Sequence, residues 1–432
     1  MVPLADRPAA DAGDGSGSGA GTAAVRARGA IGSALDGLRV PLIAAPMLRV
    51  SDLVLTSAAV RSGIVGAFPT LNARSTAGLR DWLTELDAVQ AEVGPSEVRQ
   101  GEVPPGEVQQ SAGQLGDVPL VEVPRSTGRG LFCPNLVMAD AHVREHAALV
   151  AESSARLVIT SVGSPAPVTG LFAEAGIAVF ADVATVAHAR KAAAAGATGL
   201  VLLTAGAGGQ TGWLNPFAFI TAVRAFFDGP VVLAGGMTGG RSLAAARVAG
   251  YDLAYSGTPF IATEESPADP AYIAEITGAD PDDILLTSAF TGLPTNMLLP
   301  SIRASGLDPA RLDEEVRPEA ASELFGNRAR GVGPRRWADI RSAGHSVAGV
   351  DSVVSVAALV DRFAAEYGEA LAGFPALATS APADRSDPAP ASAPAGDPAR
   401  ADAPDPVATS APAGTPDPAP ASAPAGMPDP PT

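Results

Sequence analysis

The sequence predicts an α/β fold: a (β/α)8 TIM barrel with an appended C-terminal helical region and disordered termini. Eight short apolar runs alternate with helical segments between residues 38 and 266, as expected for parallel strands joined by crossover helices. Three consecutive runs within 201–266 each end in a glycine turn, which lets the backbone approach a ligand closely. The length of 432 residues suits one barrel with additions.

The order of the runs supports a closed barrel. The expected strands are 40–47, 63–68, 131–138, 156–162, 176–183, 197–206, 231–237 and 252–260. The expected helices include 51–61 with Ser51 as N-cap, 75–93, one through His142 and His146, one after Pro165, 184–196, 215–227 with Asn215 as N-cap and Pro216 at its first position, and 240–250. A doubly wound open sheet is the alternative, but the eight strands do not divide into two halves.

Four segments fall outside the barrel. Residues 1–37 carry almost no large apolar side chains and are expected to be a disordered leader. Residues 93–129 read as an exposed disordered insertion, and 267–374 as a helical region packing on the barrel. Residues 375–432 form a disordered Pro/Ala-rich tail, in which DPAPASAPAG at 387–396 returns at 417–426.

Composition excludes several classes of function. The net charge of −17 argues against nucleic acid and anionic membranes as partners, because both are bound through Lys and Arg. No apolar run is long enough to span a bilayer and the N-terminus does not resemble a signal peptide, so we expect a cytoplasmic protein. The single cysteine, Cys133, excludes an internal disulfide, and we expect it to be an inert buried thiol. His142 and His146 are four residues apart, but without a third ligand they are expected on an exposed helix face, and no metal is predicted.

The glycine turns indicate a phosphate site. In barrels, the loops after the seventh and eighth strands often present backbone N–H groups to an anion. Ala234, Gly235 and Gly236 would form one such loop, with Met237 and Thr238 leading into the next helix. Tyr255, Ser256, Gly257 and Thr258 would form the other, with the Thr258 hydroxyl as a further donor. Either loop alone could be a plain strand-to-helix turn, but their succession favours a phosphate-bearing cofactor.

Five motifs carry a resemblance to a known family. A-P-M follows the first strand, P-N-L the third, A-G-x-G-G the sixth, A-G-G the seventh and S-G-T-P-F-I-A-T-E-E-S the eighth. Their order and spacing, with FTGLPTN (290–296) and SAGHSVAG (342–349), resemble the nitronate monooxygenase family from about residue 38 to 370. The resemblance implies an FMN-dependent barrel enzyme, and a related branch contains FMN-dependent enoyl-acyl carrier protein reductases.

The resemblance also implies roles for single residues. Ala45, Pro46 and Met47 would lie along the isoalloxazine ring, although a methionine there could also be core filler. Asn135 would bond the edge of the flavin, or else be a satisfied turn residue. Asp182 would hold the ribityl hydroxyls, with helix capping as the alternative. Gly208 and Gly209 belong to the loop at the reacting end of the site.

The sequence departs from the family at the reacting end. Well-known members read A-G-G-H after strand six, whereas this chain has Gln210, and Leu203 stands where members often carry a flavin-contacting glutamine. A glutamine amide can hydrogen-bond a nitro group but cannot act as a general base. We therefore expect Gln210 to orient a small-molecule substrate, with Thr211 and Trp213 at the pocket wall, although packing is the simpler role for Trp213. The expected reaction is oxidation of preformed alkyl nitronates by molecular oxygen, with poor activity on neutral nitroalkanes.

Two rival functions stay open. The first is an FMN-dependent NAD(P)H enoyl reductase of a biosynthetic pathway, and the second is a non-catalytic FMN-binding protein, consistent with the lost histidine. His345, in SAGHSVAG, could replace the missing base if it reached the pocket, but a loop position beside a helix is the alternative. The sequence makes no prediction of oligomeric state.

Overall fold

The computed structural model describes residues 31–93, 128–326 and 333–379. Most of the expected leader, insertion and tail therefore lie outside the described residues. The described residues as far as Ala378 belong to one compact unit.

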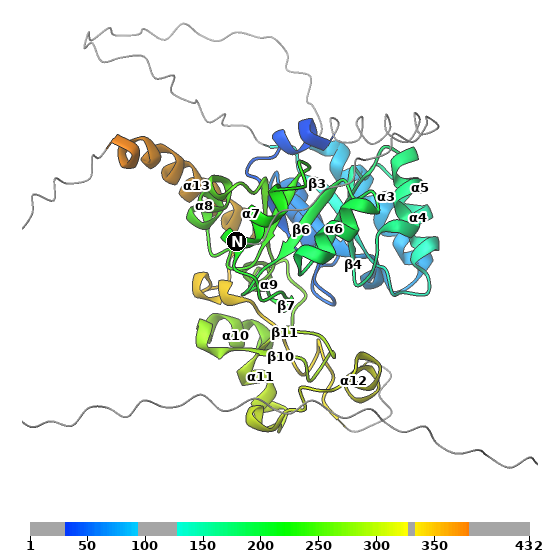
Figure 1. Ribbon diagram of the computed structural model, residues 1–432, viewed down its shortest axis with the longest axis vertical. Helices are drawn as coiled ribbons and strands as arrows, with labels where there is room; N and C mark the ends of the chain where they lie inside the picture. Colours follow the sequence, from blue (N-terminus) through cyan, green and yellow to red (C-terminus); the bar gives the residue numbers. More distant parts are fainter. Residues whose placement is uncertain (1–30, 94–127, 327–332, 380–432) are drawn as a thin grey trace, which may run out of the picture. The chain divides into compact units, whose positions relative to one another are not determined.

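Eight parallel strands close into a barrel in the order β1-β2-β3-β4-β5-β6-β8-β9, which confirms the predicted fold class (Figure 1). The strands are β1 (Leu42–Ala44), β2 (Val65–Pro69), β3 (Leu131–Val137), β4 (Leu157–Ser161), β5 (Ala178–Val183), β6 (Gly199–Leu203), β8 (Val231–Ala234) and β9 (Leu253–Ser256). Closure occurs where Ile43 pairs with Val65 on one side and with Tyr255 on the other.

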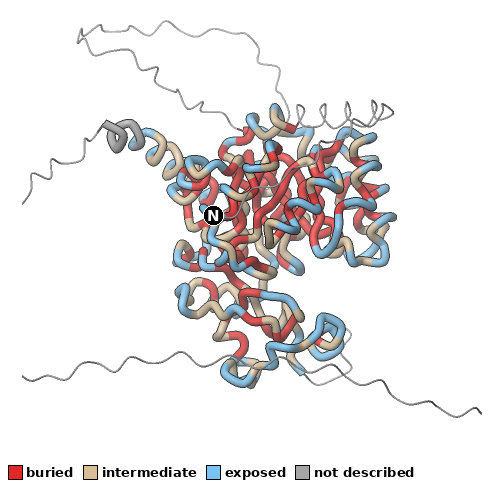
Figure 2. The backbone as a smooth tube through the Cα atoms, in the orientation of Figure 1, coloured by how far each residue is buried: buried red, intermediate tan, exposed pale blue. Residues whose placement is uncertain are grey.

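The strands are apolar on both faces because each face is covered (Figure 2). Alternate residues such as Ile43 and Val201 fill the barrel interior, whereas Leu42 and Leu202 pack outward against the helices. The Phe180 ring fills the interior beside Gly199, its partner on β6, where an added Cβ would stand 2.5 Å from the ring.

Four of the barrel helices begin at side-chain caps. The barrel helices are α2 (Leu53–Arg61), α3 (Thr76–Glu92), α4 (Val143–Ala151), α5 (Ala166–Glu174), α6 (Val186–Ala194), α7 (Pro216–Arg224), α8 (Gly240–Ala249) and α9 (Thr258–Ile261), with the short 3-10 helix η1 (Thr70–Ala73) after β2. Asn215 caps α7 as predicted, accepting from the Phe217 N–H at 3.0 Å. The predicted cap Ser51 is wrong, because Asp52 accepts from the Leu55 N–H and caps α2.

The N-terminal boundary also differs from the prediction. Residues 31–36 are helical, although the sequence places them in the disordered leader. Ile31 is 2% exposed and packs with Leu38 into the cluster that fills the barrel interior. Leu35 also packs against this cluster, so Ile31, Leu35 and Leu38 follow a helical i, i+4, i+7 spacing that is too short to stand out in the sequence.

The appended region is not only helical, which corrects the expectation for 267–374. Strands β10 (Ile284–Thr287) and β11 (Thr295–Leu298) form an antiparallel sheet with β7 (Gly209–Gln210), a short strand from the loop after β6. The surrounding helical elements are α10 (Pro270–Gly278), η2 (Pro281–Asp283), α11 (Leu299–Ala304), η3 (Pro309–Arg311), α12 (Pro318–Phe325) and η4 (His345–Gly349). The appended region thus adds strands to a loop of the barrel.

Helix α13 (Val356–Thr379) packs on the barrel. Its buried side chains include Val356, Leu359, Val360 and Phe363, which join the cluster between strands and helices. No helix among the described residues is long and apolar enough to cross a membrane.

Candidate active site

A cavity of about 480 Å³ opens at the carboxyl ends of the barrel strands. It brings together all but one of the residues predicted for the site. Those lining it are Ala45, Pro46, Met47, Asn135, Asp182, Gly208, Gly209, Gln210, Gly235, Gly236, Met237, Tyr255, Gly257 and Thr258. Residues from nearly every barrel strand therefore meet at one site, as the glycine turns suggested.

Two polar side chains, Ser51 and Asn72, hydrogen-bond the backbone of the loop after β1. The Ser51 hydroxyl accepts from the Met47 N–H and donates to the Ala45 carbonyl, both at 2.9 Å. Asn72 donates to the Met47 carbonyl at 2.9 Å. Ser51 therefore stabilises the loop after β1 and is not the predicted helix cap.

The loop after β8 has the geometry of an anion site. Gly235 and Gly236 have φ values of 128° and 69°, in the region that favours glycine. An added Cβ at Gly236 would meet nothing within 4 Å, so the backbone there faces open space. Among the described residues, the N–H groups of Gly236 and Met237 have no hydrogen-bond partner, and they are available to an anion.

The loop after β9 completes this side of the cavity. The Thr258 hydroxyl accepts from the Gly344 N–H at 2.9 Å, and its own proton is left for another acceptor. Ser256 differs from the prediction: its side chain is 1% exposed and does not line the cavity, because the preceding Tyr255 takes the inward position of the strand. Ser256 contributes its carbonyl, which accepts from the Ala45 N–H at 2.8 Å.

Asp182 lies on β5 at the floor of the cavity. Its Oδ1 atom is buried and has no hydrogen-bond partner among the described residues. Burial raises the pKa of Asp182 to about 7, because the charged form loses its hydration. Burial, and then the nearby Asp182 charge, also raise the pKa values of Cys133 and Tyr255. The alternative role of Asp182 as a helix cap is wrong, since Thr185 caps α6.

Asn135 lies on β3 beside Asp182 in the cavity lining. Its amide donates to the Ile159 carbonyl at 3.3 Å and to the Ser161 hydroxyl at 3.2 Å, and it is 4% exposed. It is a strand residue, so the alternative of a turn residue is wrong. Both donor contacts are long, and a ligand acceptor could compete for the amide.

The loop carrying Gln210 is fixed by the appended region. Gln210 pairs with Thr295 across β7 and β11, and the Asn296 side chain donates to the Ala207 carbonyl at 2.7 Å. Gly208 approaches Gly344 so closely that an added Cβ would lie 2.8 Å from the Gly344 nitrogen. The Gln210 side chain lines the cavity without a hydrogen-bond partner among the described residues. Its amide is therefore free to bind a ligand.

The appended region also supplies cavity residues that the sequence analysis missed. They are Tyr272, Thr291, Leu293, Pro318, Ser322, Arg336, Trp337, Arg341, Ser342, Ala343 and Ser346. The segments FTGLPTN and SAGHSVAG were the available signals, for Thr291 and Leu293 and for Ser342, Ala343 and Ser346, but no pattern marks the others. They reach the site only because β10 and β11 add to the loop after β6.

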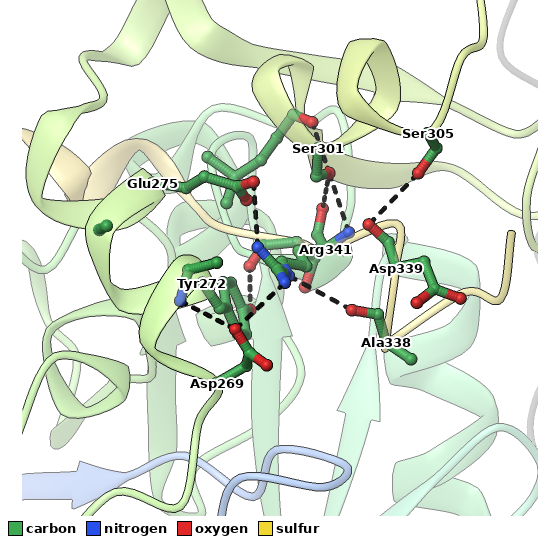
Figure 3. A network of polar contacts seen from close by, with 12 residues as sticks. Asp269, Tyr272, Glu275, Ser301, Ser305, Ala338, Asp339 and Arg341 are labelled. Atoms are coloured by element: carbon green, nitrogen blue, oxygen red, sulfur yellow. Dashed lines mark hydrogen bonds and ion pairs between the residues drawn. The ribbon is translucent and has the colours of Figure 1, made fainter.

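Arg341 is the centre of a polar network in this part of the cavity wall (Figure 3). Its guanidinium pairs with Glu275 at 3.0 Å and with Asp269 at 3.5 Å, and it stacks 5.6 Å from the Tyr272 ring centroid. Tyr272 donates to the Ser342 carbonyl, and burial raises its pKa to about 12. Arg341 is thus committed to structural carboxylates.

Several other predicted placements are corrected. Trp213 is 75% exposed and Thr211 is buried, and neither lines the cavity. His345 is exposed and outside the cavity lining, so it does not replace the missing base. His146 is not on an exposed face: it is 6% exposed and lies 3.1 Å from the Thr70 hydroxyl, and burial lowers its pKa.

Together these features define a barrel protein with a glycine-edged, largely apolar site at the carboxyl ends of its strands. The sequence profile of nitronate monooxygenase matches residues 127–365, more than half of the chain. The chain therefore belongs to the nitronate monooxygenase family, a family of flavin-dependent oxidoreductases.

Curated relatives match part of the chain. A nitronate monooxygenase of Paraburkholderia phytofirmans is 29% identical over 183 residues, covering 40% of this chain and 50% of the relative. The (3aS,4S,5R,7aS)-5-hydroxy-7a-methyl-1-oxo-octahydro-1H-indene-4-carboxyl-CoA dehydrogenase of Rhodococcus jostii is 28% identical over 163 residues, covering 38% of this chain and 46% of the relative. The alignments thus span about half the length of these relatives.

Solved structures share the fold. FabK from Thermotoga maritima superposes with a TM-score of 0.60 at 21% identity, covering 80% of this chain and 98% of that one. Nitroalkane oxidase from Streptomyces ansochromogenes gives a TM-score of 0.58 at 22% identity, covering 78% and 99%. At these identities the likeness concerns the fold alone.

Proposed function

We propose that the protein is an FMN-dependent enzyme that oxidises alkyl nitronates with molecular oxygen and acts poorly on neutral nitroalkanes. The observation that carries the proposal is the place of Gln210 in the cavity lining. The family resemblance implies a histidine at this position in well-known members. Family membership supports the flavin, and the nitronate monooxygenase among the relatives supports the reaction class.

The residues present fit FMN. The free N–H groups of Gly236 and Met237, with the Thr258 hydroxyl, would hold the phosphate. The unpartnered Asp182 carboxyl would hold a ribityl hydroxyl or a polar ring edge. Ala45, Pro46 and Met47, with Asn135, Gly208, Gly209, Gly235, Tyr255 and Gly257, would enclose the rest of the cofactor.

The chain's own residues then decide the substrate. Bound FMN supplies the electron acceptor and the centre that reacts with oxygen. The Gln210 side-chain NH₂ would donate to a nitro oxygen and orient the substrate. A nitroalkane must first lose a proton, and the cavity lining contains no histidine among the described residues. Asp182, on β5, is the one carboxyl group among the described residues that line the cavity.

Two measurements test the proposal. The purified protein should be yellow, with flavin absorption bands, and a colourless protein that takes up no added FMN would refute the cofactor. Oxygen consumption should then be roughly 10² times faster with ethylnitronate than with nitroethane, the usual cost of a missing base. Equal rates with the two substrates would refute the specificity.

One observation favours a second candidate reaction. The cavity adjoins an arginine-lined space that a small nitronate would leave empty, and one relative is named as acting on a CoA ester. An FMN-dependent NAD(P)H enoyl reductase acting on enoyl thioesters would use such a space. Anaerobic bleaching of the flavin by NADPH would favour this reductase, and bleaching by ethylnitronate alone would favour the oxygen-dependent reaction.

A further inference from the structure

A second cavity, here called the outer cavity, adjoins the cavity of the candidate active site, here called the inner cavity. The volume of the outer cavity is about 1420 Å³. The same residues line both cavities where they meet: Leu48, Leu71, Ala139, Ser322, Arg336 and Trp337. Single small-molecule sites usually occupy 300–1,000 Å³, so the two cavities together suit a much longer ligand than an alkyl nitronate.

The outer cavity is rich in arginine although the whole chain is acidic. Arg49, Arg74 and Arg336 line it, in a protein whose net charge is −17. Its two carboxylates are already hydrogen-bonded to backbone. Asp52 caps α2, and Asp140 accepts from the His142 N–H at 2.6 Å and pairs with the His142 ring at 3.3 Å. The arginines therefore set the charge available to a ligand.

Two of these arginines lack an acidic partner. The Arg336 guanidinium donates only to neutral groups, the Phe290 carbonyl and the Ser322 hydroxyl, both at 3.2 Å. It is half-buried, and burial lowers its pKa. Arg74 forms no ion pair among the described residues. Arg74 is exposed, whereas the partly desolvated Arg336 guanidinium is costly to leave without a carboxylate unless an anion binds it. The planar fork of either guanidinium suits phosphate.

The remaining walls suit an aromatic base. Trp82 and Trp337 line the outer cavity, and Trp337 also reaches the inner one. Trp337, Arg49 and Arg74 have φ values of 64°, 66° and 65°, which non-glycine residues adopt rarely. Such backbone strain tends to be kept at ligand sites, and here it falls on three residues of one cavity.

We propose that the outer cavity binds the phosphorylated adenine-nucleotide portion of a substrate or cosubstrate whose reacting end enters the inner cavity. Arg74 and Arg336 would bind phosphate, and a tryptophan would stack on the adenine. Coenzyme A esters and NADPH share this chemistry. The inference rests on the proposed function only for the position of the reacting end.

Equilibrium binding to the FMN-loaded protein tests the site without turnover. Coenzyme A and NADPH are titrated separately, with tryptophan fluorescence and calorimetry as readouts. We expect at least one to bind, with an affinity that falls as salt is raised. Arg336→Gln and Arg74→Asn should each weaken binding about tenfold, the loss of one charge-assisted hydrogen bond. Asn tolerates the left-handed backbone at position 74, so that variant remains informative if Arg336→Gln does not fold.

The matched control is Arg303→Ala, an exposed arginine on α11 outside both cavities, which should leave binding unchanged. Binding of coenzyme A would identify a thioester substrate, and binding of NADPH a nucleotide reductant. If neither binds, or if Arg303→Ala weakens binding as much as the cavity variants, the outer site is refuted. Intact FMN absorption and ethylnitronate oxidation in that case would leave the proposed function standing.

Discussion

Gln210 is the residue on which the proposed substrate preference depends. Gln210 lines the cavity from a loop that is held by the pairing of β7 with β11. A histidine at this position would keep the same backbone pairing. We expect Gln210→His to raise the rate with nitroethane by roughly 10²-fold, because an imidazole can accept the α-proton. The rate with ethylnitronate should stay within about threefold, since that substrate needs no base. Oxygen consumption with the two substrates measures both rates.

The control for this substitution is Gln210→Met, which keeps the length of the side chain but removes the amide. It should lower the rate with ethylnitronate about tenfold through the lost hydrogen bond, without any gain on nitroethane. A Gln210→His variant that is no faster with nitroethane would mean that the missing base does not limit the wild-type protein.

Asp182 makes stability depend on pH in an unusual direction. Its pKa is about 7 in the folded protein and near 4 when unfolded, so the folded state binds the proton more tightly between these values. Its contribution is therefore most favourable below about pH 4 and is lost as pH rises through about 7. Asp182→Asn should become the more stable protein near neutral pH, by a few kcal/mol.

Thermal unfolding of the FMN-free proteins over this pH range provides the test, read as the difference in Tm between wild type and variant. Taking the difference cancels the titration of shared groups such as His146. The nearby Cys133 and Tyr255 have raised pKa values and do not titrate in this window. A difference that is constant with pH would contradict the assignment.

At the scale of elements, the pairing of β7 with β11 connects the appended region to the reacting end of the site. Asn296→Ala would leave the buried Ala207 carbonyl without its donor, at a cost of about 1–3 kcal/mol. We expect a higher KM for ethylnitronate, because the loop of Gln210 loosens, and an unchanged affinity for FMN, because the phosphate loops are separate. Leu286→Ala, on the exposed face of β10, should change neither value.

The same element scale explains what the sequence could and could not predict. Strand residues such as Ile43 and Val201 reveal the barrel because the apolar pattern repeats along the chain. Asp182 and Gly236 were predictable because barrel sites lie at the carboxyl ends of strands. Arg336 and Trp337 were not, since only the pairing of β11 with a barrel loop carries their segment to the cavity. Ser256 was wrongly predicted to line the cavity, because side chains alternate along β9 and the preceding Tyr255 takes the inward position.

In the compact unit that ends at Ala378, α13 contacts the start of α8. Glu366 accepts from the Gly240 N–H at 2.7 Å at the start of α8. An added Cβ at Gly240 would collide with the Phe363 carbonyl, so the two helices touch through backbone. In the adjoining contact, Gly349 packs against Thr238, directly after the glycine loop. The N-terminus of α8 is thus occupied by a protein carboxylate, and under the proposed function a cofactor phosphate would bind at Gly236 and Met237 instead.

This arrangement predicts unequal effects from two glutamates of one helix. Glu366→Ala should lower the free energy of unfolding by about 1–2 kcal/mol, as for loss of a helix cap. Glu369→Ala should cost less than about 0.5 kcal/mol, because Glu369 pairs with Arg241 on the surface, where both side chains are largely exposed. Urea unfolding of both variants measures the difference. Equal losses would show that α13 is held by its apolar side chains alone. The Glu366 carboxylate would then contribute nothing to the stability of the contact between α13 and α8.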